Sequence, residues 1–135
     1  MTIDKIEVIN PSELADPIGY SNGLCVRGGG DLLFIAGQIG WNKEKRLVGD
    51  RFAAQFEQAL VNVLAVVQAA GGTASNIGKM TIYVTDKREY LAELKEIGSA
   101  YRQLMGKHYP AMALVEVRAL LEPSAKVEIE AIAVL

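Results

Sequence analysis

The chain has 135 residues, a formal net charge of −2 and a sequence pI of about 5.4, and 50% of its residues are hydrophobic. This length suits one globular domain, so we expect a single domain over residues 1–135. The weak acidic charge argues against binding of nucleic acid or lipid headgroups. Cys25, the single cysteine, cannot form an intramolecular disulfide, and the first residues do not have the pattern of a signal peptide. We therefore expect a cytoplasmic protein with no membrane association.

The first half of the chain predicts an irregular start, two strands and a helix. The segment "NPSELADPIGYSNG" carries two prolines and two glycines, which favour turns. A short strand is predicted in "GLCVRG" (23–28) and a buried strand over 32–36. A helix is predicted over 50–72, because apolar residues recur there at spacings of three and four and share one face: Phe52, Phe56, Leu60, Val63 and Val67. Its other face is polar and uncharged, and we expect Gln55 to be partly exposed there.

The second half predicts a strand, a helix and two more strands. The segment 79–85 alternates apolar and polar residues with the period of a strand. Asp86 and Glu89 form a capping-box pattern at the start of a predicted helix over 86–106. Further strands are predicted over 112–120 and 125–134. Helices that alternate with strands indicate crossover connections, so we expect both helices on one face of one sheet.

The last two strands predict a sheet with two different faces. The small and β-branched residues are expected to face the helices: Ala113, Val115, Val127, Ile129, Ala131 and Ala133. The other face would combine Met112 and Leu114 with Glu128 and Glu130. A face that mixes apolar side chains with carboxylates is typical of a subunit interface or a ligand cleft.

Five segments together resemble the Rid (YjgF) family, whose best-studied branch hydrolyses reactive enamines and imines. They are "AGQIG" (36–40), "QALVNVLAVVQAAGG" (58–72), "KMTIYVTD" (79–86), "YPAMALVEV" (109–117) and "VEIEAIAV" (127–134). The resemblance implies a chorismate-mutase-like α+β fold with a mixed six-stranded sheet and two helices on one face. It also implies a homotrimer whose sheets close into a barrel, with a small-molecule ligand in clefts between subunits. We expect no cofactor and, because His108 is the single histidine, no metal site.

The resemblance carries over to individual residues unevenly. In the deaminating branch an arginine grips the substrate carboxylate, but the matching residue here is Met112, whose thioether cannot make that contact. An asparagine of that branch matches a position near Gly98. The family's water-positioning glutamate matches Glu128, and its cleft tyrosine matches Tyr20. The ligand contacts that we expect are Tyr20, Gly37, Gln38, Trp41, Met112 and Leu114.

These features predict a divergent hydrolase of the enamine/imine deaminase type, in which Glu128 activates a water. Met112 and Leu114 would form an apolar wall beside the Glu128 carboxylate. Because the clamp arginine is absent, we expect a substrate other than a free amino-acid imine. Glu128 could instead pair with Lys126 or Arg118. The alternative function is a non-catalytic ligand-binding or accessory trimer of a catabolic pathway. Ribonuclease activity, reported for some family members, is not favoured by an acidic chain.

Overall fold

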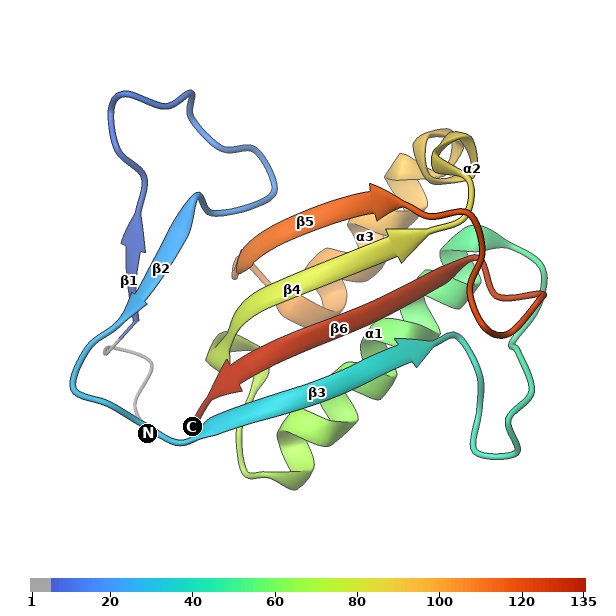
Figure 1. Ribbon diagram of the computed structural model, residues 1–135, viewed down its shortest axis with the longest axis horizontal. Helices are drawn as coiled ribbons and strands as arrows, with labels where there is room; N and C mark the ends of the chain where they lie inside the picture. The colour runs from blue at the N-terminus through green and yellow to red at the C-terminus, as the bar shows by residue number, and fades with distance from the viewer. Residues whose placement is uncertain (1–5) are drawn as a thin grey trace.

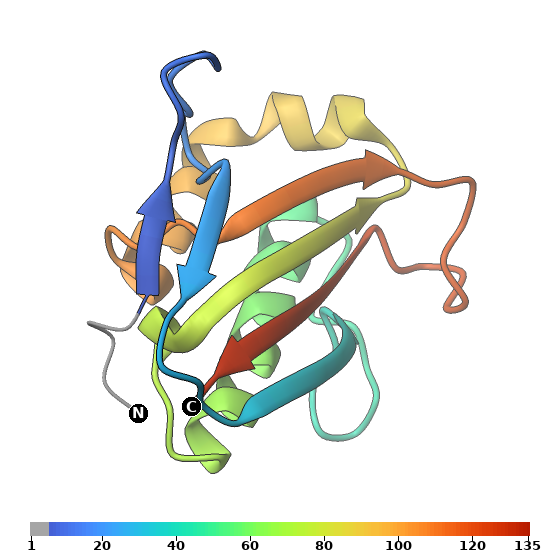
Figure 2. The same cartoon turned by 60° about the vertical axis from the view of Figure 1, so that its left-hand side comes forward.

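The computed structural model describes residues 6–135, so the first five residues of the predicted domain lie outside the described part. Within these residues, a four-stranded sheet carries the helices on one face, and a two-stranded hairpin stands beside it (Figures 1 and 2). The predicted α+β class is therefore confirmed.

The main sheet has the strand order β3-β6-β4-β5. Its strands are β3 (Leu32–Ile39), β4 (Ile77–Val84), β5 (Ala111–Glu116) and β6 (Val127–Val134). Strand β6 runs antiparallel to both of its neighbours, whereas β4 and β5 are parallel. The parallel pair requires a crossover, which the helices between β4 and β5 supply.

The helices lie behind the sheet in the view of Figure 1. Helix α1 spans Phe52–Ala69, and its five predicted apolar residues are all buried. The second predicted helix is divided at Glu93 into α2 (Lys87–Ala92) and α3 (Leu94–Met105). A short 3₁₀ turn, η2 (Ala74–Asn76), precedes β4. Within residues 6–135, no helix has both the length and the apolar character needed to cross a bilayer.

The predicted six-stranded sheet is wrong for this chain. Strands β1 (Ile6–Ile9) and β2 (Gly23–Val26) pair with each other and form a separate hairpin. The backbone between β2 and β3 turns at Gly28, Gly29 and Gly30, whose φ angles of 80°, 79° and 150° favour glycine. This turn directs the hairpin away from β3. Among the described residues, the segment between β1 and β2 is joined to the start of β5 by a parallel bridge between Ser21 and Ala111.

The sheet register corrects the predicted facing of β5. Met112 is paired with Met80 and Leu114 with Ile82, and both partners are buried under the helices. Met112 and Leu114 therefore pack against the helix-side core, while Ala113 and Val115 lie on the open face. The longer side chains fill the space beneath the helices at the sheet edge, which small residues would leave empty.

Gln55 of α1 is fully buried, although the sequence predicted partial exposure. Its side-chain amide donates to the carbonyl oxygens of Gly49 at 2.8 Å and Ser124 at 3.2 Å. Its Oε1 accepts from the backbone N–H of Lys126 at 2.8 Å. The Gln55 side chain thus ties α1 to two loops, the one that precedes α1 and the one that precedes β6.

Replacement of Gln55 by leucine should lower the free energy of unfolding by about 1–3 kcal/mol, because two loop carbonyls and one backbone N–H lose the hydrogen-bond partner that joins them to α1. Chemical denaturation measures this change. Gln68→Leu is the control, since Gln68 is exposed on the same helix and should change stability by less than about 0.5 kcal/mol. Equal effects of the two substitutions would contradict the assigned role of Gln55.

Candidate functional site

Glu128 lies on the open face of the sheet, where β6 is flanked by β3 and β4. It is paired with Tyr83 of β4 and adjoins Gly37, which lies in a bulge of β3. A side-chain carbon on Gly37 would come within 2.7 Å of Glu128 Cδ. Only glycine at this position leaves the carboxylate in its observed place.

The predicted alternative role of Glu128, pairing with Lys126, is not observed within the chain. Lys126 Nζ instead lies 2.9 Å from Glu89 Oε1. Among residues 6–135, the recorded ion pairs leave the Glu128 side chain without a cation. A half-buried carboxylate on an open face can therefore accept a hydrogen bond from a water or a ligand.

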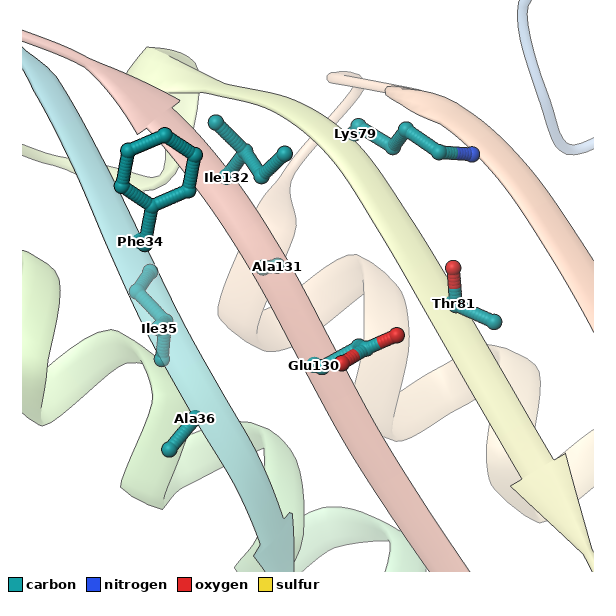
Figure 3. Close-up of a pocket in the computed structure, with 8 residues that line it drawn as sticks. All are labelled: Phe34, Ile35, Ala36, Lys79, Thr81, Glu130, Ala131 and Ile132. Carbon is teal, nitrogen blue, oxygen red and sulfur yellow. The ribbon is translucent and has the colours of Figure 1, made fainter.

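Glu130 and Tyr83 form a second polar group on the same face. The Tyr83 hydroxyl donates to Glu130 Oε1 at 2.6 Å. This hydrogen bond, with smaller effects from burial and from the charges of Glu130 and Glu128, raises the pKa of Tyr83 above its usual value. Figure 3 shows Glu130 on β6 opposite Thr81, in an open cavity of about 440 Å³ that also contacts Lys79. The sequence placed Glu130 on this face but did not identify the cavity.

The open face also exposes large apolar side chains. Phe34 is 70% exposed and Leu32 is 61% exposed, and Val115 lies on the same face. Figure 3 shows Phe34 beside Ile132 of the neighbouring strand. Leu32 and Phe34 lie on edge strand β3 and Val115 on the opposite edge strand β5, so exposed apolar side chains flank the polar centre of this face.

Met112 lines a cavity of about 410 Å³ on the opposite, helix-covered side of the sheet. The cavity lies between β5, the helices α2 and α3, and the loop that contains Ile18 and Gly19. Because Met112 and Glu128 are on opposite faces, one chain does not bring them together. The predicted apolar wall beside Glu128 is therefore absent within the chain.

Of the other predicted ligand contacts, Gln38 and Trp41 lie together, whereas Tyr20 lies in a different part of the chain. Gln38 and Trp41 share a cavity at the end of β3, where Lys45 Nζ lies 5.9 Å from the Trp41 ring centroid. Asn62 of α1 donates to the Trp41 carbonyl at 2.9 Å and fixes this turn. Tyr20 is 40% exposed in the loop before β2. The predicted residues therefore belong to several surfaces of one subunit.

His108 stabilises the loop before β5. Its Nε2 lies 2.6 Å from the Ile77 carbonyl oxygen, which can only accept, so this nitrogen carries the proton. The Tyr101 hydroxyl donates to the His108 carbonyl at 2.7 Å. The single histidine therefore anchors the loop before β5.

The raised pKa of Tyr83 gives a testable pH dependence. The fold favours the neutral phenol, so this contribution to stability is present below the usual pKa near 10 and is lost as the pH rises through the folded-state value. Glu130→Gln should lower the pKa of Tyr83 toward its usual value. A ¹³C NMR titration of the tyrosine rings, assigned with Tyr83→Phe, measures it. Glu57→Gln on the exposed side of α1 is the control, and an unchanged Tyr83 titration in Glu130→Gln would refute this cause.

The chain was compared with known proteins. A family model described as Endoribonuclease L-PSP matches residues 12–135. A RutC family protein from Sinorhizobium fredii is 36% identical over 129 residues, which cover 94% of this chain and 96% of that protein. A 2-iminobutanoate/2-iminopropanoate deaminase from Escherichia coli is 37% identical over 108 residues, which cover 78% of this chain and 80% of that protein.

Structural similarity agrees with these relationships. A crystal structure of a Rid-family protein of unknown function from Yersinia pestis has a TM-score of 0.85 and 32% sequence identity, with 97% of this chain and 99% of that chain covered. The sequence resemblance is therefore confirmed, and the chain belongs to the Rid (YjgF) family.

Proposed function

We propose that this protein is a small-molecule hydrolase that acts on the C–N bond of an imine or enamine. The observation that carries the proposal is the Glu128 carboxylate, which lies against Gly37 on an open face with no cation beside it in the described chain. The deaminase name of the Escherichia coli relative supports the reaction class.

In this proposal, Glu128 accepts a proton from a water molecule while the oxygen of that water attacks the imine carbon. The proton then passes to the nitrogen, which gives a carbinolamine. The hydroxyl proton of the carbinolamine next passes to the same nitrogen, the C–N bond breaks, and ammonia leaves with formation of a carbonyl product. An enamine first takes a proton on carbon to become the imine. Every atom comes from the substrate and water, so no further reactant is needed.

We further propose that the site is completed between copies of the chain in a homotrimer. Met112 and Glu128 lie on opposite faces of one subunit, so they can meet at one ligand only if different copies supply them. The exposed apolar residues of the open face, Leu32, Phe34 and Val115, are suited to burial between copies. Closure of three such sheets would form the barrel that the family resemblance implies.

Glu128→Gln should lower the rate of ammonia release at least about 100-fold, because the amide cannot accept the proton of the attacking water. The imines are generated in the assay mixture. An amino-acid oxidase provides imines with an α-carboxylate, and an amine oxidase provides imines without one. Gly37→Ala should show a similar loss, because its methyl group displaces the carboxylate. Glu57→Gln is the matched control.

An unchanged rate of ammonia release in Glu128→Gln would overturn the proposed role of this residue. A trimer that binds ligands but releases ammonia from none of the imines would instead support the non-catalytic accessory function.

The wild-type chain should hydrolyse 2-aminoacrylate slowly, because Met112 cannot hold the α-carboxylate as arginine does in the deaminating branch. Met112→Arg should raise this rate about tenfold or more, the effect of one charge-assisted hydrogen bond. The rate of ammonia release measures hydrolysis by both proteins, and Met112→Leu is the control for altered packing. A wild-type rate equal to that of an arginine-bearing relative would show that the arginine is not needed.

A further inference from the structure

The cavity above Met112 combines aromatic walls with one charged side chain. Tyr101 and Tyr109 stack with ring centroids 5.5 Å apart, and Tyr90 adds a third ring to the lining. Arg102 is the single charged residue among those that line this cavity. An apolar pocket with one well-placed polar group is the usual form of a small-molecule site.

The Arg102 side chain lies close to a glycine one turn earlier in α3. Gly98 and Arg102 are four residues apart and so share one side of the helix. A Cβ atom built on Gly98 would lie 3.3 Å from Arg102 Nη1. The guanidinium therefore lies over Gly98, where a larger side chain at position 98 would compete with it.

Arg102 is an exposed residue of α3 and, like Arg46 and Arg118, takes no part in the ion pairs recorded among residues 6–135. Arg51 is held by Glu93 and Glu96, and Arg88 is held by Asp86. None of the ion pairs recorded among residues 6–135 includes Arg102. Its charge is thus available to an anion that enters the cavity.

We infer that Arg102 binds the carboxylate of a ligand whose aromatic body fills the cavity above Met112. The guanidinium can bind a carboxylate through two parallel hydrogen bonds, and the tyrosine rings offer a large apolar surface to the rest of the ligand. The cation comes from helix α3 instead of from the strand position occupied by Met112. The carboxylate is therefore held at a different place in the cavity from one bound at position 112.

Binding of a carboxylate by Arg102 stands by itself, whereas the identification of this ligand as the substrate rests on the proposed function. It then specifies the substrate class as a bulky anionic imine or enamine rather than a small amino-acid imine. Arg102 becomes a specificity-determining residue of the reaction, whereas Glu128 of another copy supplies the chemistry.

Isothermal titration calorimetry with hydrocinnamate tests the inference, because this stable aromatic carboxylate requires no turnover. Hydrocinnamamide, its neutral counterpart, and acetate, a small anion, are the comparison ligands. The proteins are the full-length wild type, Arg102→Gln and the control Arg46→Gln. Arg46 is exposed in the loop after β3 and does not line this cavity. The methyl NMR signal of Met112 reports whether the ligand occupies the cavity.

The wild type should bind hydrocinnamate at least about tenfold more tightly than hydrocinnamamide or acetate. Arg102→Gln should abolish the preference for the carboxylate and leave amide binding unchanged, and Arg46→Gln should behave as the wild type. Ligand binding should shift the Met112 methyl signal.

Three results would overturn the inference: no hydrocinnamate binding by the wild type at millimolar ligand, equal binding by Arg102→Gln, or binding that leaves the Met112 signal unchanged. Ammonia release that still depends on Glu128 would in those cases leave the proposed function standing. Conversely, carboxylate binding through Arg102 without any ammonia release would support the ligand site and reject the hydrolase.

Discussion

The register of the central strand β4 against its two neighbours determines where every other feature of this protein lies. Met80 is aligned with Ala131 of β6 and with Met112 of β5, so these residues share the face beneath the helices. Because side chains alternate along a strand, the same pairing places Tyr83 and Glu128 on the open face. A one-residue shift of β6 against β4 would exchange the two faces of β6 and turn Glu128 and Glu130 toward the helices, and the same shift of β5 would expose Met112 and Leu114.

Buried and half-buried amide side chains hold the segments at the ends of this sheet. Gln55 joins α1 to the segments before α1 and β6, and Asn62 binds the carbonyl oxygens of Ile39 and Trp41 at the end of β3. Asn76 donates to the carbonyl of Val134 at 2.8 Å and fixes the end of β6. These amides bind backbone groups in loops and at the ends of strands, so helix packing and the conformation of these segments depend on each other.

The sequence predicted most of the fold because the relevant signals are local. The apolar spacing of α1 and the alternation in β4 each specify an element and its buried side. Strand β5 was harder, since both of its faces carry apolar residues and periodicity alone does not choose between them. The hairpin depends on the backbone angles of Gly28–Gly30, and the burial of Gln55 depends on distant loops. The three glycines permit these angles without specifying them, and the partners of Gln55 are distant in sequence, so neither feature could be predicted from the local pattern.

The candidate site shows the same division. Residue matching identified Glu128 and the missing arginine at Met112, because each is a property of one position. The cation of Arg102 could not be found in that way, since its relation to Met112 arises only when α3 packs over β5. The same cavity can be lined by a cation from a helix instead of a strand, and the absence of a side chain at Gly98 leaves room for Arg102 there. If Arg102 has the proposed role, the absence of arginine at position 112 changes the place where a ligand carboxylate is bound and does not remove the binding site.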